Sequence, residues 1–95
     1  MVVHIFILRW KPEATQAHKD RALAEVLAFQ GQIPGLVETY AGNNFSTRSQ
    51  GHDFGAVMKF TDRAALDAYA ISPLHQQLLA WFAPLVESID VDFAI

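Results

Sequence analysis

The first strand that the sequence predicts is apolar on both faces, and this feature constrains the fold more than any other. Residues 2–10 are rich in β-branched and aromatic side chains, and Pro12 closes the segment. Side chains alternate along a strand, so one face carries His4, Phe6, Leu8 and Trp10 and the other carries Val3, Ile5 and Ile7. An antiparallel sheet with one wet face alternates apolar with polar residues. We therefore expect a central strand whose two faces are both covered.

Hydrophobic spacing and turn residues predict the remaining elements. Strands are expected at residues 36–41, 54–60 and 89–95, and helices at residues 17–30, 63–69 and 74–86. Asp62 and Ser72 are suited to cap the last two helices, and Pro73 takes the favoured first helical position. No linker or repeat divides the chain, so residues 1–95 are expected to form a single domain.

The order of these elements is β-α-β-β-α-β, which is typical of ferredoxin-like folds of the α+β class. Right-handed crossovers would place the first and third strands in the centre of a four-stranded antiparallel sheet with helices on one face. A second copy of the sheet is the simplest cover for the bare face. We expect a homodimer that buries Val3, Ile5, Ile7 and Val57 between its subunits. Asp90 and Asp92 on the edge strand would form the polar rim of that interface.

Composition argues against several classes of partner. The net charge is −3 and the seven Lys and Arg residues form no basic stripe, so no nucleic-acid partner is expected. No apolar segment reaches the roughly 20 residues of a membrane span, and no positively charged region precedes the first strand. These features predict a cytoplasmic protein that does not associate with membranes. Cysteine is absent, His4 and His75 lack a third ligand, and no cofactor motif occurs, so neither a metal nor an organic cofactor is expected.

Four segments in a specific order resemble the stress-responsive A/B barrel (Dabb) family. They are residues 4–12, 32–36, 42–44 and 69–75, and the likeness extends from His4 to Phe93. The resemblance implies a dimeric α+β barrel, in a family whose members are mostly of unknown function. Many members have a histidine before the proline of the last segment, where this chain has Ser72; serine caps a helix equally well.

The same resemblance points to candidate catalytic residues. One plant member of the family is a polyketide cyclase that makes olivetolic acid by an aldol condensation, and its catalytic histidine, supporting tyrosine and second histidine match His75, Tyr69 and His4. A histidine can take a proton from an activated carbon and return it. The step also needs a hydrogen-bond donor for the enolate oxygen and exclusion of water. His75 would be the base, Tyr69 the orienting or donating hydroxyl, and His4 a second donor.

We expect these three side chains to meet in a cavity between the sheet and the helices. The apolar lining is expected to comprise Phe6, Leu8, Leu23, Val26, Ala56, Met58 and Trp81. Such a lining, with a few convergent polar groups, is the usual composition of a small-molecule site. The ligand would be a small apolar carbonyl compound.

The sequence is compatible with two classes of function. The first is a cofactor-independent cyclase, lyase or isomerase that acts by proton transfer; related dimeric barrel families include monooxygenases, so oxygenation also stays open. The second is a non-catalytic, stress-responsive protein that binds a small molecule or has a structural role, in which the three polar side chains serve packing and helix capping. His18 and His52 are expected on the solvated surface.

Overall fold

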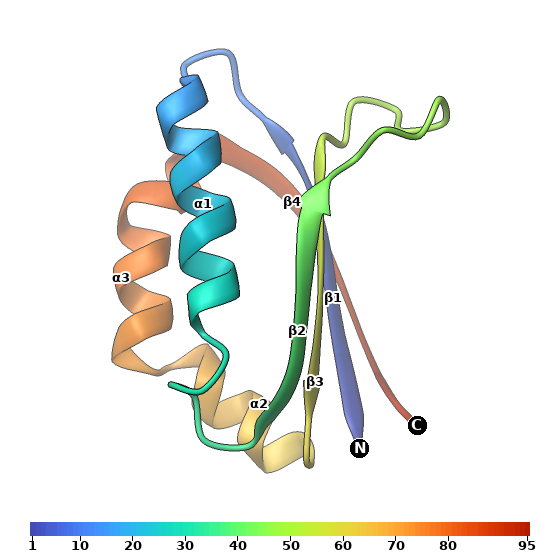
Figure 1. Cartoon of the computed structure of the whole chain (residues 1–95), viewed down its shortest axis with the longest axis vertical. Helices are drawn as coiled ribbons and strands as arrows, with labels where there is room; N and C mark the ends of the chain where they lie inside the picture. Colours follow the sequence, from blue (N-terminus) through green and yellow to red (C-terminus); the bar gives the residue numbers. More distant parts are fainter.

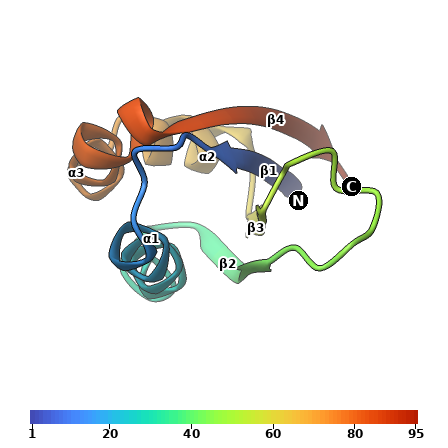
Figure 2. The same ribbon diagram turned by 90° about the horizontal axis from the view of Figure 1, so that it is seen from above.

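One four-stranded antiparallel sheet is covered on a single face by helices (Figures 1 and 2). The computed structural model describes all residues, 1–95. The elements are β1 (Val2–Trp10), α1 (Gln16–Ala28), β2 (Leu36–Asn43), β3 (Phe54–Phe60), α2 (Arg63–Ala70), α3 (Pro73–Phe82), a 3₁₀ turn η1 (Ala83–Leu85) and β4 (Val86–Ala94). The strand order is β2-β3-β1-β4. The predicted ferredoxin-like α+β fold, with β1 and β3 in the centre, is therefore confirmed.

Side-chain caps fix where the helices begin. Thr15 accepts from the backbone N–H of His18, Asp62 from that of Ala65, and Ser72 from that of His75. Each cap satisfies one of the N–H groups that the first helical turn leaves without a partner. None of the helices combines the length and the apolar character that crossing a bilayer would require.

The predicted last helix is too long, and the predicted last strand too short. Helix α3 ends at Phe82, Pro84 lies in the 3₁₀ turn, and β4 begins at Val86. Proline has no N–H to continue the helical hydrogen bonds. Val86 instead pairs with Trp10, so β4 runs alongside the whole of β1.

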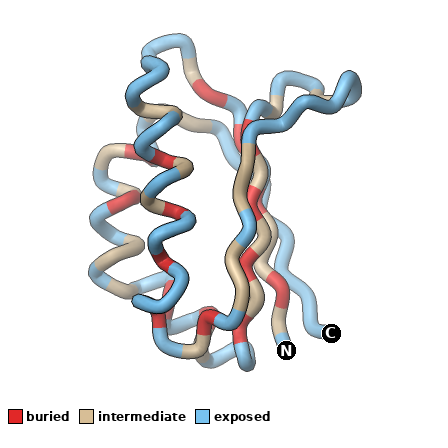
Figure 3. The backbone as a smooth tube through the Cα atoms, viewed as in Figure 1, coloured by how far each residue is buried: buried red, intermediate tan, exposed pale blue.

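A core of sixteen buried residues lies between the sheet and the helices. The largest fully buried side chains are Phe54, Phe60, Leu8, Met58 and Val26. Burying each contributes about 1.5–3 kcal/mol to folding. Figure 3 shows this burial on the inner sides of both layers, whereas β4 is almost entirely exposed.

The other face of the sheet has no helix over it. Ile5 pairs with Val57 on β3 and with Val91 on β4, and Ile7 pairs with Ile89. Exposed apolar side chains on this bare face include Ile7, Ile89, Val91 and Phe93. The bare face is thus apolar across three strands.

The expected position of Asp90 and Asp92 at the rim of the bare face is wrong. The register places Asp92 opposite His4 and Asp90 opposite Phe6, on the face toward the helices. Because successive side chains of a strand point to opposite faces, this register sends the apolar residues of β4 to the bare face instead. Polar and apolar residues alternate along β4, but the sequence alone does not say which set faces the helices. That is decided by the register in which β4 pairs with β1.

Candidate functional site

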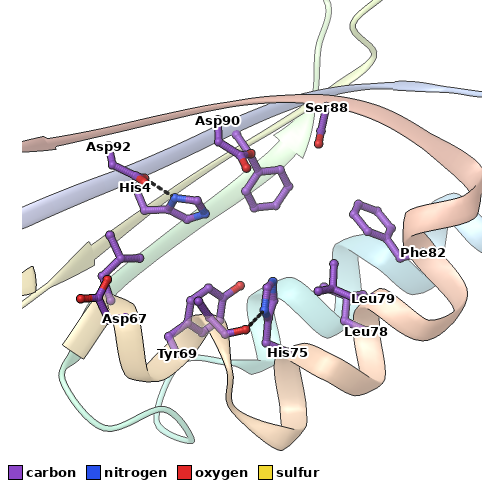
Figure 4. A pocket seen from close by; sticks show the side chains of 13 residues that line it. His4, Asp67, Tyr69, His75, Leu78, Leu79, Phe82, Ser88, Asp90 and Asp92 are labelled. Atoms are coloured by element: carbon purple, nitrogen blue, oxygen red, sulfur yellow. Dashed lines mark hydrogen bonds and ion pairs between the residues drawn. The ribbon is translucent and has the colours of Figure 1, made fainter. Parts of the chain in front are cut away.

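A cavity of about 370 Å³ opens between β1 and β4 on one side and α2 and α3 on the other (Figure 4). Its thirteen lining residues are His4, Phe6, Leu66, Asp67, Tyr69, Ala70, His75, Leu78, Leu79, Phe82, Ser88, Asp90 and Asp92. The volume falls in the range of small-molecule sites. Apolar side chains form one part of the wall, and polar side chains from four elements converge on the rest.

His4 reaches the cavity from β1 and is held by a carboxylate of β4. Its ring Nδ1 lies 2.5 Å from Oδ1 of Asp92, and its side chain is 14% exposed. A carboxylate can only accept a hydrogen bond when it is ionised, so Nδ1 carries the proton of this contact. The Nε2 atom of His4 is left without a protein partner. Orientation of a histidine by a carboxylate is the arrangement that fixes its tautomer and the direction of its ring.

His75 enters the cavity from the first turn of α3. Its backbone N–H donates to the Ser72 hydroxyl at 3.3 Å, and its ring Nδ1 lies 2.8 Å from the carbonyl oxygen of Ala70. A carbonyl oxygen only accepts, so Nδ1 is the protonated nitrogen. In the neutral ring the free lone pair is then on Nε2, which takes no hydrogen bond from the protein. The helix start therefore positions a base whose tautomer is defined.

Tyr69 lies between the two histidines and is almost fully buried. Its ring centroid is 4.5 Å from that of His75 and 6.2 Å from that of His4, and the residue is 3% exposed. Phe29 and Phe60 pack against its ring. The hydroxyl makes no hydrogen bond within the chain, so its donor is free for a ligand in the cavity.

The environment of Tyr69 also fixes its protonation. Desolvation by burial raises the pKa of the Tyr69 hydroxyl well above its ordinary value, and the negative charge of Asp90 raises it further. The phenol therefore stays neutral across the physiological range. It is a hydrogen-bond donor and not a base.

The structure thus brings His4, Tyr69 and His75 together, as the sequence resemblance implied. Two ring Nε2 atoms and one hydroxyl face a space whose wall combines apolar side chains such as Phe6 and Leu78 with the polar side chains of β4 and Asp67. A base beside a neutral donor is the arrangement that proton transfer next to a carbonyl requires. No group of three or more His, Asp or Glu side chains is arranged to hold a metal ion.

Most of the expected apolar lining lies elsewhere, and only Phe6 borders the cavity. Leu8, Val26, Ala56 and Met58 are buried in the core, and Leu23 packs against that core. The reason is that α1 lies directly on the sheet and leaves no space there. Under α2 and α3, by contrast, β4 presents Ser88, Asp90 and Asp92, which are too short to fill the space.

Trp81, the remaining expected lining residue, faces α1. Its indole N–H donates to Glu25 at 3.4 Å, and the Arg21 guanidinium lies 4.4 Å from its ring. His18 stacks on the same ring at 6.0 Å, and its Nδ1 accepts from the backbone N–H of Thr15. His18 is half-buried at the surface, and beyond the solvated position expected for it, it completes the cap of α1. His52 lies in the β2–β3 loop, with Nδ1 3.1 Å from the Ser49 carbonyl oxygen.

Sequence reasoning missed the polar side chains that β4 contributes to the cavity. Ser88, Asp90 and Asp92 all line it, and Asp67 joins them from α2. The alternation of β4 signalled that the aspartates share one face. The pairing of His4 with Asp92 in the β1–β4 register shows that these aspartates face the helices and line the cavity.

Similarity to known proteins covers nearly the whole chain. The sequence model of the stress responsive A/B barrel domain matches residues 2–94. No curated protein is significantly similar to the chain in sequence. Among solved structures, a dimeric ferredoxin-like protein of unknown function from Jannaschia sp. CCS1 is 29% identical with a TM-score of 0.84, covering 99% of this chain and 98% of the other.

Two more distant solved structures belong to enzymes. A hydroxynitrile lyase from Passiflora edulis is 21% identical with a TM-score of 0.88, covering 99% of this chain and 92% of the other. SnoaB, a cofactor-independent oxygenase from Streptomyces nogalater, is 18% identical with a TM-score of 0.78, covering 99% and 91% respectively. At such identities the similarity shows the fold alone.

Tyr69 should keep its proton well above pH 10, near which an exposed phenol ionises. Absorbance of the phenolate during a pH titration of the folded protein measures this directly. We expect the Tyr69 phenol to ionise only at much higher pH or on unfolding. Because the unfolded chain gives up the Tyr69 proton first, the free energy of unfolding should fall as the pH rises past about 10.

The Tyr69→Phe variant is the control for this titration. The difference between the wild-type and Tyr69→Phe titrations is the ionisation of Tyr69, and it should appear only at the late, high-pH step. Ionisation of Tyr69 near pH 10 in the folded protein would contradict the buried, neutral donor.

Proposed function

Since this chain belongs to the stress-responsive A/B barrel domain family, we propose that its cavity carries out a cofactor-independent proton transfer on a small apolar carbonyl compound. The observation that carries the proposal is the placement of two groups side by side. His75 has an unprotonated Nε2 in its neutral form, and the buried residue Tyr69 presents to the cavity a hydroxyl that has no protein partner. Both line the same cavity of about 370 Å³.

The proposed reaction begins with proton abstraction next to the carbonyl group. Nε2 of His75 takes the proton from the α-carbon, and the electron pair moves onto the carbonyl oxygen. The Tyr69 hydroxyl donates a hydrogen bond to that oxygen as negative charge develops there. The protonated His75 then returns the proton to product, while Nδ1 stays bonded to the Ala70 carbonyl throughout.

His4 is proposed as the second proton-handling group. Its Nδ1 is taken up by the bond to Asp92, so in the protonated ring Nε2 of His4 would donate to the substrate from the sheet side of the cavity. This division of roles corresponds to that implied by the resemblance to the plant polyketide cyclase. A lyase reaction uses the same groups, because cleavage of a carbon–carbon bond beside a hydroxyl also begins with removal of a proton.

Replacement of His75 should abolish this activity. In D₂O, deuterium exchange at the α-carbons of 4-phenylbutan-2-one, followed by NMR, reports proton abstraction without knowledge of the natural substrate. His75→Ala should slow the enzyme-dependent exchange by roughly 10²–10⁴-fold, as expected for loss of a general base. Tyr69→Phe should have a smaller effect, because the base remains.

His52→Ala is the matched control, since it removes a histidine from the β2–β3 loop and should leave exchange unchanged. Circular dichroism confirms that each variant is folded. Exchange by His75→Ala at the wild-type rate would contradict the proposal. If the wild-type protein promotes no exchange, the non-catalytic binding function stands instead.

We further propose that the functional unit is a homodimer in which the two bare sheet faces meet. The bare face is apolar and has a shallow groove bordered by Ile5, Ile7, Tyr40 and Val57. The β2–β3 loop extends beyond the sheet on this side, away from the helices (Figure 1), and carries Phe45, which is 98% exposed. A second copy would cover both features, and the relative from Jannaschia is dimeric. A chain of this size gains much from such burial.

An aspartate at the centre of the bare face should prevent dimerisation. Ile5→Asp would place a charge in a dry interface, at a cost of several kcal/mol. Light scattering coupled to gel filtration should give a dimer for the wild type and a monomer or aggregate for this variant. Leu27→Asp is the control, because Leu27 is an exposed apolar residue on α1. A monodisperse wild-type monomer would overturn the dimer.

A further inference from the structure

Two carboxylates that line the cavity, those of Asp67 and Asp90, make no hydrogen bond and no ion pair within the chain, and Asp90 lies on the wall opposite Tyr69 (Figure 4). Asp90 projects from the inner face of β4 toward the cavity, between Asp92 and Ser88 (Figure 4). Asp92 accepts a hydrogen bond from His4, whereas the Asp90 side chain makes no hydrogen bond and no ion pair. Strand β1 places apolar Phe6 directly opposite it. A carboxylate that nothing in the chain requires is available to a ligand.

The cavity as a whole carries negative charge. Its lining includes Asp67, Asp90 and Asp92, and contains no Lys or Arg. The lining residues that can become positively charged are His4 and His75, and the His4 ring is already bonded to Asp92. A partly enclosed site lined by one sign of charge repels ligands of the same sign.

A second, independent feature points to a ligand in this cavity, namely the tyrosine hydroxyl that has no partner in the chain. The Tyr69 hydroxyl lines the same cavity on a residue that is 3% exposed, and it has no partner in the chain. Tyr69 offers a donor to a ligand oxygen, and Asp90 offers an acceptor from the opposite wall. A ligand that satisfies both carries an acceptor such as a carbonyl at one end and a donor or a cation at the other.

We infer that the cavity selects its ligand by charge: it accepts uncharged or cationic carbonyl compounds and rejects carboxylates and phosphates, with Asp90 as the specificity-determining residue. This inference rests on the proposed function, because it concerns the same cavity. Rejection follows from bringing two negative charges together in a partly enclosed site that offers no Lys or Arg to offset them, and it does not require a steric barrier. Hydroxyl and ammonium groups are accepted because each can donate to Asp90.

Three probes of equal length test this selection. They share an acetyl group on a benzene ring and differ at the para position: 4′-(aminomethyl)acetophenone is a cation, 4′-(hydroxymethyl)acetophenone is neutral, and 4-acetylbenzoate is an anion. Binding is measured near pH 7 at low salt, from NMR shifts of the His4 and His75 ring protons. The wild type should bind the cationic and neutral probes at least about 10-fold more tightly than the anion.

The Asp90→Asn variant should remove most of this preference. Affinity for the anion should rise by about 3- to 10-fold, affinity for the cation should fall by a similar factor, and the neutral probe should change little. Glu87→Gln is the matched control, because it removes the same charge from the same strand on the opposite face. That variant should keep the wild-type order of affinities.

Three results would overturn the inference. They are equal binding of the anion and the other probes by the wild type, an equal effect of Asp90→Asn on all three probes, and the absence of ring-proton shifts with every probe. Because these are binding measurements, they are independent of turnover. Selective binding without deuterium exchange would support the charge selection and count against the proposed proton transfer.

Discussion

The pairing of β4 with β1, which sets His4 opposite Asp92, is the constraint on which the rest of the structure depends. One register decides three things at once. It holds His4 by a carboxylate, it directs short polar side chains under α2 and α3 so that a cavity remains, and it turns the apolar residues of β4 to the bare face. Because the side-chain period of a strand is two, a shift by one residue would reverse all three. The chemistry and the assembly of this protein therefore have a common structural origin.

The junction of α2 and α3 supplies the other half of the site. Ser72 begins α3, and the same turn brings the ring of His75 against the Ala70 carbonyl and beside Tyr69. Capping interactions usually serve helix stability alone. Here the cap also sets the tautomer of a histidine, so the base is positioned by main-chain geometry and not by a flexible side chain. The buried tyrosine next to it is held neutral by the same apolar surroundings that close the cavity.

Much of the fold followed from the sequence because its signals are local. The two apolar faces of β1, the caps at Asp62 and Ser72, and the order of elements each depend on nearby residues. The cavity wall did not follow, because it depends on which parts of the interior stay unfilled. Leu8 and Met58 are equally apolar whether they line a cavity or fill a core, and only the packing of α1 decides between them. The inward direction of Asp90 required the β1–β4 register, which no local pattern contains.

The proposed chemistry depends on His75, which the fold holds as a base with its lone pair on Nε2. Long-range ¹H–¹⁵N correlation of the histidine rings near pH 8 tests this most directly, with the His75 signals identified by their loss in His75→Ala. The structure predicts that neutral His75 carries its proton on Nδ1, because that nitrogen donates to the Ala70 carbonyl at 2.8 Å. A neutral His75 with the proton on Nε2 would contradict the proposed role of His75, since its lone pair would then not face the cavity.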